Sequence, residues 1–281
     1  MLSMRHLLGV ASAIGLAAFM STGPAHAGKV FLTGHDPDFH AQPGAGAGGD
    51  LLQIGISFVT NGTYNSGTSK FLWVESTIPV PGGHLRGEDS LSNALGLTLG
   101  VHYDRVDGAG FSALSDAQLG SYTAIAIAST FGGTLTAAEL AALNARADDI
   151  AAFVNSGGGL FASAECFPCG ANLAGSATGL FGFVPVVVTS IGANPPFNVT
   201  PFGASLGLTN ADVNDPTHNS FGLVGGLNVV DTDAAGNATT LAGDVRIDDG
   251  GFVPTPEPGT IALLMGGLIA LGFGARRRIG N

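Results

Sequence analysis

One short segment carries the residue types that bind divalent metal ions: His35, Asp36, Asp38 and His40. Imidazole nitrogens and carboxylate oxygens suit Zn²⁺, Mn²⁺ or Fe²⁺. Pro37 interrupts this segment and predicts a loop there rather than the start of a helix. In the alternative interpretation, the aspartates form Asx turns and the histidines are hydrogen-bonded in place. The segment is therefore a candidate site for a divalent metal cofactor, with a purely structural role left open.

A second set could support nucleophilic catalysis. The thiolate of Cys166 would be the nucleophile, His218 its base, and Glu75 or Glu165 the group that orients the base. Cys166 also forms a Cys-x-x-Cys pair with Cys169, and in an oxidising compartment such a pair forms a short disulfide. Since a disulfide would block the thiolate, the two interpretations exclude each other, and the second set predicts either a cysteine-dependent hydrolase or a structural bridge.

Predicted strands would place these polar residues at one edge of a sheet. Short apolar runs predict buried strands, followed by polar residues, at 29–33, 71–74, 122–128 and 160–164. Between the last two runs, Thr136 and Glu139 form a capping box at the start of a helix with an apolar stripe that reaches Val154. A strand–helix–strand unit of this length predicts a right-handed crossover and a parallel sheet. Ligands of such sheets bind at the carboxyl ends of the strands, where these residues would lie.

The expected fold class is therefore α/β, with a doubly wound, mostly parallel sheet. Beyond residue 170 the pattern weakens, and short runs at 183–190, 227–230 and 239–241 predict an irregular, β-rich C-terminal part. The glycine-rich stretch 44–49 fits G-x-G-x-x-G, but it stands ten residues past the first strand. A dinucleotide fingerprint needs its glycines directly in the strand-to-helix turn, so a flexible loop is the better interpretation.

The run Gly-Gly-Gly-Leu-Phe-Ala at 157–162, leading into a turn at Glu165 and Cys166, resembles the class I glutamine amidotransferase-like superfamily. The resemblance implies a flavodoxin-like fold, with a cysteine on a tight turn between glycines and a downstream His-x-Glu pair. Here Ala164 and Pro168 stand where glycines are expected, and Ser220 stands where the glutamate is expected. The resemblance therefore implies the architecture without the amidotransferase activity.

The two terminal segments predict export. Arg5 and His6 precede an apolar run at 7–20, and Ala25-His26-Ala27 offers a signal peptidase site before Gly28. At the other end, Pro256-Glu257-Pro258 is followed by an uncharged apolar run at 259–275 and by Arg276, Arg277 and Arg278. Seventeen residues span roughly 25 Å as a helix, enough to cross a hydrocarbon core, and the arginines predict a cytoplasmic end.

This tail resembles the PEP-CTERM sorting signal of Gram-negative bacteria. The resemblance implies that a membrane-embedded exosortase processes the chain near Pro-Glu-Pro and releases or re-attaches it outside the inner membrane. The expected organisation is a signal peptide (1–27), an exported α/β domain (28–250), a linker with the Pro-Glu-Pro motif (251–258), and a transmembrane sorting helix with its Arg-rich end (259–281).

Removal of both signals leaves six Lys and Arg against 21 Asp and Glu, a net charge of −15. Such a domain lacks the basic surface that binds nucleic acid. The main hypothesis is an exported surface or extracellular-matrix protein with a non-catalytic, amidotransferase-like binding domain, whose partner could be an extracellular polysaccharide. The alternative is a metal- or cysteine-dependent hydrolase that uses the strand-end His, Glu and Cys residues.

Overall fold

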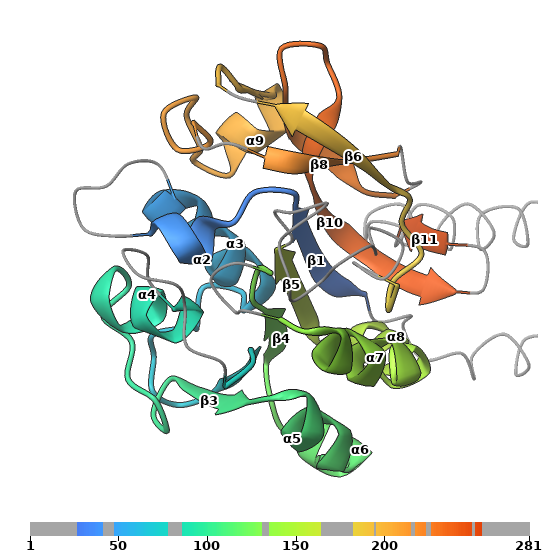
Figure 1. Cartoon of the computed structure of the whole chain (residues 1–281). Coiled ribbons are helices and arrows are strands. Elements are labelled where there is room, and N and C mark those ends of the chain that lie inside the picture. The colour runs from blue at the N-terminus through green and yellow to red at the C-terminus, as the bar shows by residue number, and fades with distance from the viewer. Residues whose placement is uncertain are drawn as a thin grey trace, which may run out of the picture.

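The computed structural model of the chain describes residues 27–41, 48–77, 86–130, 135–163, 182–193, 195–214, 217–222, 226–248 and 251–254 (Figure 1). Its strands are β1 (Gly28–Thr33), β2 (Phe71–Val74), β3 (Tyr103–Val106), β4 (Ala124–Ile127), β5 (Gly159–Ser163), β6 (Val188–Ala193), β7 (Asn198–Val199), β8 (Thr217–Phe221), β9 (Asn228–Thr232), β10 (Ala238–Asp248) and β11 (Gly251–Pro254). Its helices are α2 (Pro37–His40), α3 (Gly48–Val59), α4 (Gly87–Asn93), α5 (Gly108–Ala113), α6 (Asp116–Leu119), α7 (Ala137–Ala145), α8 (Ala147–Asn155) and α9 (Pro201–Ser205).

These strands form one mixed sheet with the order β3-β2-β4-β5-β1-β10-β8-β6. The first five are parallel to one another. β10 then runs antiparallel to β1 over six paired residues and also pairs with β8, β9 and β11. The predicted α/β class and the parallel sheet are therefore confirmed, and the β-rich C-terminal part extends the same sheet.

The sheet is covered on both faces, because alternate residues of each strand point to opposite sides. Leu72 and Val74 of β2 belong to one apolar cluster, which includes residues of α5, α6, α7 and α8. Phe71 and Trp73 of the same strand belong to a second cluster, which includes residues of α3 and α4. Each cluster is a core between a helical layer and the sheet, so the parallel half is doubly wound (Figure 1).

The strand order differs from the flavodoxin order, in which the first strand lies between the second and the third. Here β1 lies between β5 and β10, at the junction of the parallel and antiparallel halves. The long β10 supplies the partner that holds β1 there, from Gly28 opposite Val245 to Thr33 opposite Thr240. The short C-terminal β runs at 227–230 and 239–241 do not predict an eleven-residue strand beside β1.

Two local expectations were wrong in detail. The helix expected to run from Thr136 to Val154 is two helices, α7 and α8, which meet at Arg146. The capping box of Thr136 and Glu139 is present as predicted. Pro37 lies at the first position of α2 rather than in a loop. Proline suits this position because a backbone N–H in the first turn has no acceptor within the helix, so its absence costs no hydrogen bond.

The first four residues of the predicted linker, 251–254, form the strand β11, which pairs with β10. Across the part of the chain that the structure describes, no helix is long and apolar enough to cross a membrane. The predicted sorting helix at 259–281 and residues 1–26 of the predicted signal peptide fall outside that part.

Candidate functional site

The connections after β2 and β4 leave the sheet in opposite directions. From β2 the chain passes through α4 to the edge strand β3, whereas from β4 it passes through α7 and α8 to β5 on the other side. Such a point, where neighbouring parallel strands part, opens a crevice outside their carboxyl ends and is the usual ligand site of open α/β sheets. Glu75 and Ser76 follow β2 at this point of the sheet, and Ser129 and Thr130 follow β4. These four buried residues define the region that is called the crevice below.

Asp38 reaches this crevice from α2. Its side chain is fully buried, and Oδ2 accepts a hydrogen bond of 2.9 Å from the backbone N–H of Ser129. Its other oxygen, Oδ1, is buried and has no hydrogen-bond partner among the residues the structure describes. Loss of solvation raises the pKa of Asp38 from 3.8 to about 6. The nearby charge of Glu75 also raises this pKa, whereas the hydrogen bonds from Ser129 lower it.

Glu75, by contrast, is held by several donors. Trp73 Nε1 and the backbone N–H of Glu88 each donate to Oε2 over 3.1 Å. Arg86 donates to Oε1 over 3.3 Å, and Arg105 forms an ion pair with the same oxygen through Nε. Burial still raises the pKa of Glu75, although Trp73, Arg105 and Arg86 act in the other direction. A carboxylate with this many donors orients its surroundings and has little capacity left to act as a base.

Gly87 packs against the carboxylates of both Asp38 and Glu75. A methyl group at this position would lie 2.7 Å from Cζ2 of Trp73, 2.9 Å from Oδ2 of Asp38 and 3.1 Å from Oε2 of Glu75. The first turn of α4 therefore packs directly on both carboxylates, and only a residue without a side chain fits there. The first turn of α4 and the indole of Trp73 therefore both border these two carboxylates.

His35 lies on the same loop but faces the antiparallel half of the sheet. Its Nε2 is 3.0 Å from Oδ2 of Asp231 on β9, with both side chains fully buried. The hydroxyl of Thr239 donates to the same oxygen over 2.6 Å. The ring edge of His35 also packs on Phe197, with 4.8 Å between the ring centroids. This pair links the end of β1 to β9 and β10.

We expect Asp231→Ala to destabilise the protein by about 3 kcal/mol, because His35 and Thr239 would lose their buried acceptor. Chemical denaturation with an unchanged m-value measures this loss in the free energy of unfolding. Asp244→Ala is the matched control: this carboxylate is exposed on the adjacent β10, and its removal should change stability by less than about 0.5 kcal/mol. Equal effects of the two substitutions would show that the His35–Asp231 pair adds no stability.

The four predicted metal ligands do not meet as one set. His35 contacts Asp231, Asp38 contacts Ser129, and Asp36 lies 3.6 Å from His40. The described residues contain no group of three or more His, Cys, Asp or Glu side chains that could hold a metal ion. The physical reason is α2, which separates the side chains by winding the segment into a helical turn where a loop was expected.

The structure tests only part of the predicted catalytic set. Glu75 lies at the expected edge of the sheet, while Glu165, Cys166 and Cys169 fall outside the described residues. His218 belongs to β8, and its side chain is also outside what the structure describes. The catalytic and disulfide assignments therefore stay predictions.

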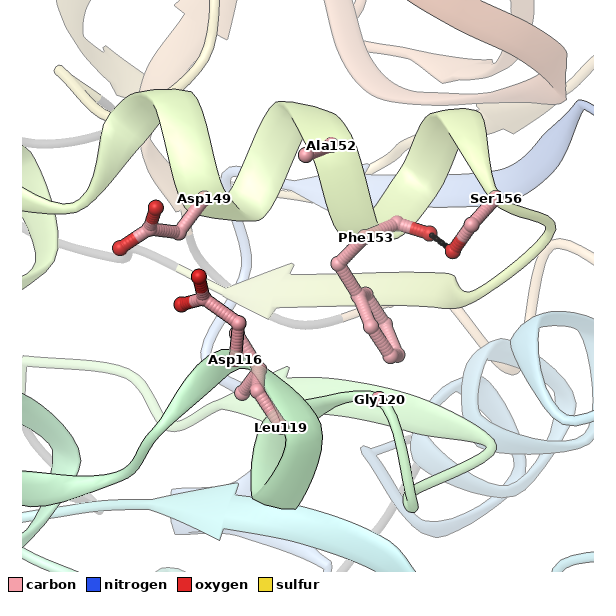
Figure 2. Close-up of a pocket in the computed structure, with 7 residues that line it drawn as sticks. All are labelled: Asp116, Leu119, Gly120, Asp149, Ala152, Phe153 and Ser156. Atoms are coloured by element: carbon pink, nitrogen blue, oxygen red, sulfur yellow. Dashed lines mark hydrogen bonds between the residues drawn. The ribbon is translucent and has the colours of Figure 1, made fainter.

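A pocket at the opposite edge of the sheet lies between α6 and α8, with a volume of about 200 Å³ (Figure 2). Phe153 and the carboxylates of Asp116 and Asp149 line it. Arg146 pairs with both carboxylates, at 3.2 Å to Asp116 and 2.7 Å to Asp149. Both carboxylates of the pocket thus already have a cationic partner within the protein. The pocket adjoins the amino ends of β4 and β5 rather than the carboxyl ends where ligands usually bind.

Comparison with known proteins bears on the C-terminal segment. Residues 254–278 match a family model, the PEP-CTERM protein-sorting motif. The chain carries an exosortase sorting signal. This match confirms the predicted sorting motif, which includes Pro256, Glu257, Pro258 and the three arginines Arg276, Arg277 and Arg278. The PEP-CTERM motif indicates a protein that an exosortase sorts to the exterior.

No curated protein and no solved structure matches the chain. The amidotransferase-like resemblance of the central domain therefore has no support from these comparisons, and the PEP-CTERM match covers only the C-terminal segment. What the α/β domain does must be argued from its own residues.

Sequence reasoning missed several residues of the crevice and also the partner of His35. Ser129 could have been found, because it directly follows the strand predicted at 122–128. No sequence pattern indicates that Arg86 and Arg105 belong to a site, since a single arginine in a loop or on a short strand is usually a solvated surface residue. Asp231 lies in a Gly- and Asn-rich region whose pairing with His35, 196 residues away, only the tertiary fold reveals.

Proposed function

We propose that this chain is an exported exosortase substrate whose α/β domain binds a ligand at the crevice between the carboxyl ends of β2 and β4. The observation that supports the ligand site is the buried carboxyl of Asp38, which has one oxygen bound to Ser129 and the other without a partner among the described residues. An unpaired buried polar atom costs stability, and a bound ligand, ion or water molecule that pairs with it removes that cost.

The proposed route follows the sequence signals at both ends. Signal peptidase removes residues 1–27, and the apolar run at 259–275 holds the precursor in the inner membrane with its arginines in the cytoplasm. An exosortase then cuts near Pro256-Glu257-Pro258, and the domain is released or re-attached at the outer surface or in the extracellular matrix. The PEP-CTERM match at 254–278 supports the exosortase step and the export of the protein.

A non-catalytic binding role is the first proposal for the domain, because the donors around Glu75 leave it unsuited to orient a catalytic base. A hydrolase is the second candidate, and one observation favours it. Asp38 has a pKa of about 6, close to the range in which a carboxyl can serve as a general acid or base.

Intact mass of the natively exported protein tests the route. We expect a chain that begins at Gly28 and ends near Glu257, and we expect an epitope tag placed after Asn281 to be absent from it. Replacement of Pro256-Glu257-Pro258 by alanines should keep the tag on the protein. Ile279→Ala, just beyond the matched residues, is the control and should be processed normally. A tag that stays on the mature extracellular protein would contradict the proposed processing.

The same measurement, made with and without reductant, tests the cysteine-dependent form of the hydrolase candidate. A mass lower by two hydrogen atoms before reduction would place Cys166 and Cys169 in a disulfide and exclude a thiolate nucleophile. A free thiol in the exported protein would favour the cysteine-dependent hydrolase over the binding role.

A further inference from the structure

The partners of Asp38 define what a ligand must offer. Oδ1 is an acceptor, so the group that binds it must carry an N–H or O–H donor. Ser129 already supplies the donor for Oδ2, and Gly87 packs against that side of the carboxyl. A ligand group can therefore complete the carboxyl only at Oδ1.

The charges around the crevice select among donors. The elements packed near Asp38 carry these charged or titratable groups: Asp36 before α2 and His40 at its end, Asp50 on α3, Glu75 after β2, Arg86, Glu88 and Asp89 at α4, and Arg105 on β3. Both arginines are engaged by neighbours: each contacts Glu75 and donates to the carbonyl of Ser76. Arg105 also lies 3.3 Å from Glu88.

This arrangement disfavours an anionic ligand, because the nearby cations are already paired and the carboxylates outnumber them. A buried carboxylate whose second oxygen lacks a donor is stabilised most by a positive group, which supplies both a hydrogen bond and the opposite charge. A neutral hydroxyl would supply only the hydrogen bond.

We propose that the crevice between β2 and β4 takes a small ligand with a cationic amine, whose N–H donates to Oδ1 of Asp38. This inference rests on the proposed ligand site and names its ligand class. Asp38 is the binding residue, and Glu75 is a positioning residue that holds Trp73 and the two arginines around it.

Trp73 makes the proposal directly measurable. It is the single tryptophan of the chain, it is fully buried, and it lies beside Gly87 and Glu75 at the crevice. Because the chain has no other tryptophan, its tryptophan fluorescence reports on this site only. The experiment titrates the purified protein at pH 8, in amine-free buffer at constant ionic strength, with ethylammonium chloride, glycerol, sodium phosphate and calcium chloride.

We expect a saturable change in Trp73 emission with ethylammonium only. Asp38→Asn should weaken ethylammonium binding roughly 10- to 100-fold, because it removes the charge that strengthens the hydrogen bond. Asp116→Asn, at the opposite edge of the sheet, is the matched control and should leave the titration unchanged.

A pH series with the unmodified protein covers the case in which Asp38→Asn fails to fold. Ethylammonium affinity should fall as the pH drops through about 6, where Asp38 takes up a proton. His40→Gln should keep this dependence, since the imidazole of His40 lies 3.6 Å from the carboxylate of Asp36. Affinity that does not change with pH would overturn the assignment to Asp38.

Saturation with glycerol, phosphate or calcium instead of ethylammonium would overturn the cationic amine while leaving the crevice as the ligand site. No saturable change with any of the four probes would overturn the amine proposal and count against the ligand site as well. The two failures are therefore distinguishable.

Discussion

Glu75→Ala is expected to cost about 3–5 kcal/mol of unfolding free energy, the typical loss when one partner of a buried ion pair is removed. The substitution leaves Arg86 and Arg105 facing each other without their shared carboxylate, and their side chains are only 15% and 23% exposed. It also leaves the indole N–H of Trp73 and the backbone N–H of Glu88 without an acceptor. Chemical denaturation measures the loss.

Asp104→Ala is the matched control for this prediction. Asp104 also pairs with a basic residue, Lys70, at 2.9 Å, but the two side chains are 34% and 39% exposed. Exposed pairs contribute little, so we expect a loss below about 1 kcal/mol. Glu75→Gln should fall between the two, because it keeps an acceptor oxygen and loses the charge. If Glu75→Ala and Asp104→Ala had equal effects, the network around Glu75 would not be a structural centre of the crevice.

The second large effect concerns pH. The pKa of Asp38 is about 6 in the folded protein, against an ordinary value of 3.8. Because the folded state binds this proton more tightly, the contribution of Asp38 to stability is fully present below pH 3.8 and is lost as the pH rises through about 6. The difference amounts to something on the order of 3 kcal/mol between pH 3.8 and pH 7.5.

Asp38→Asn isolates this contribution, because the amide is neutral at every pH. Relative to the unmodified protein, the variant should gain on the order of 3 kcal/mol of unfolding free energy as the pH rises from 3.8 to 7.5. Urea denaturation of both proteins across this range gives the difference directly. A constant difference between them would mean that Asp38 titrates alike in the folded and unfolded states.

Local pattern predicted the parallel half of the sheet well. The apolar runs at 71–74 and 122–128 contain β2 and β4, and the capping box at Thr136 begins α7 as expected. These features depend on neighbours within one strand or one helical turn, which the sequence shows directly. The predicted strands in turn predicted that polar residues gather at the carboxyl edge of the sheet, and Glu75 and Asp38 were expected at that edge.

Contacts over long sequence distances could not be predicted. The place of β1 depends on β10, and the partner of His35 is Asp231. The hydrogen bond between Asp38 and Ser129 joins residues 91 positions apart. Periodicity carries no information on such pairs, so the sequence grouped Asp38 with the histidines beside it. The fold instead turns it towards β4, away from the proposed metal set.

The last strand has a mechanical consequence for an anchored form of the protein. Pro254 is both the end of β11 and the first residue matched by the sorting motif, and only Thr255 separates it from Pro256. If processing occurs at Pro-Glu-Pro, the stalk left below the sheet has an extended length of about 10 Å. A domain attached through so short a stalk would lie close to the surface that holds it. A pulling force on that attachment would act on the pairing of β11 with β10 before it reached any other part of the fold.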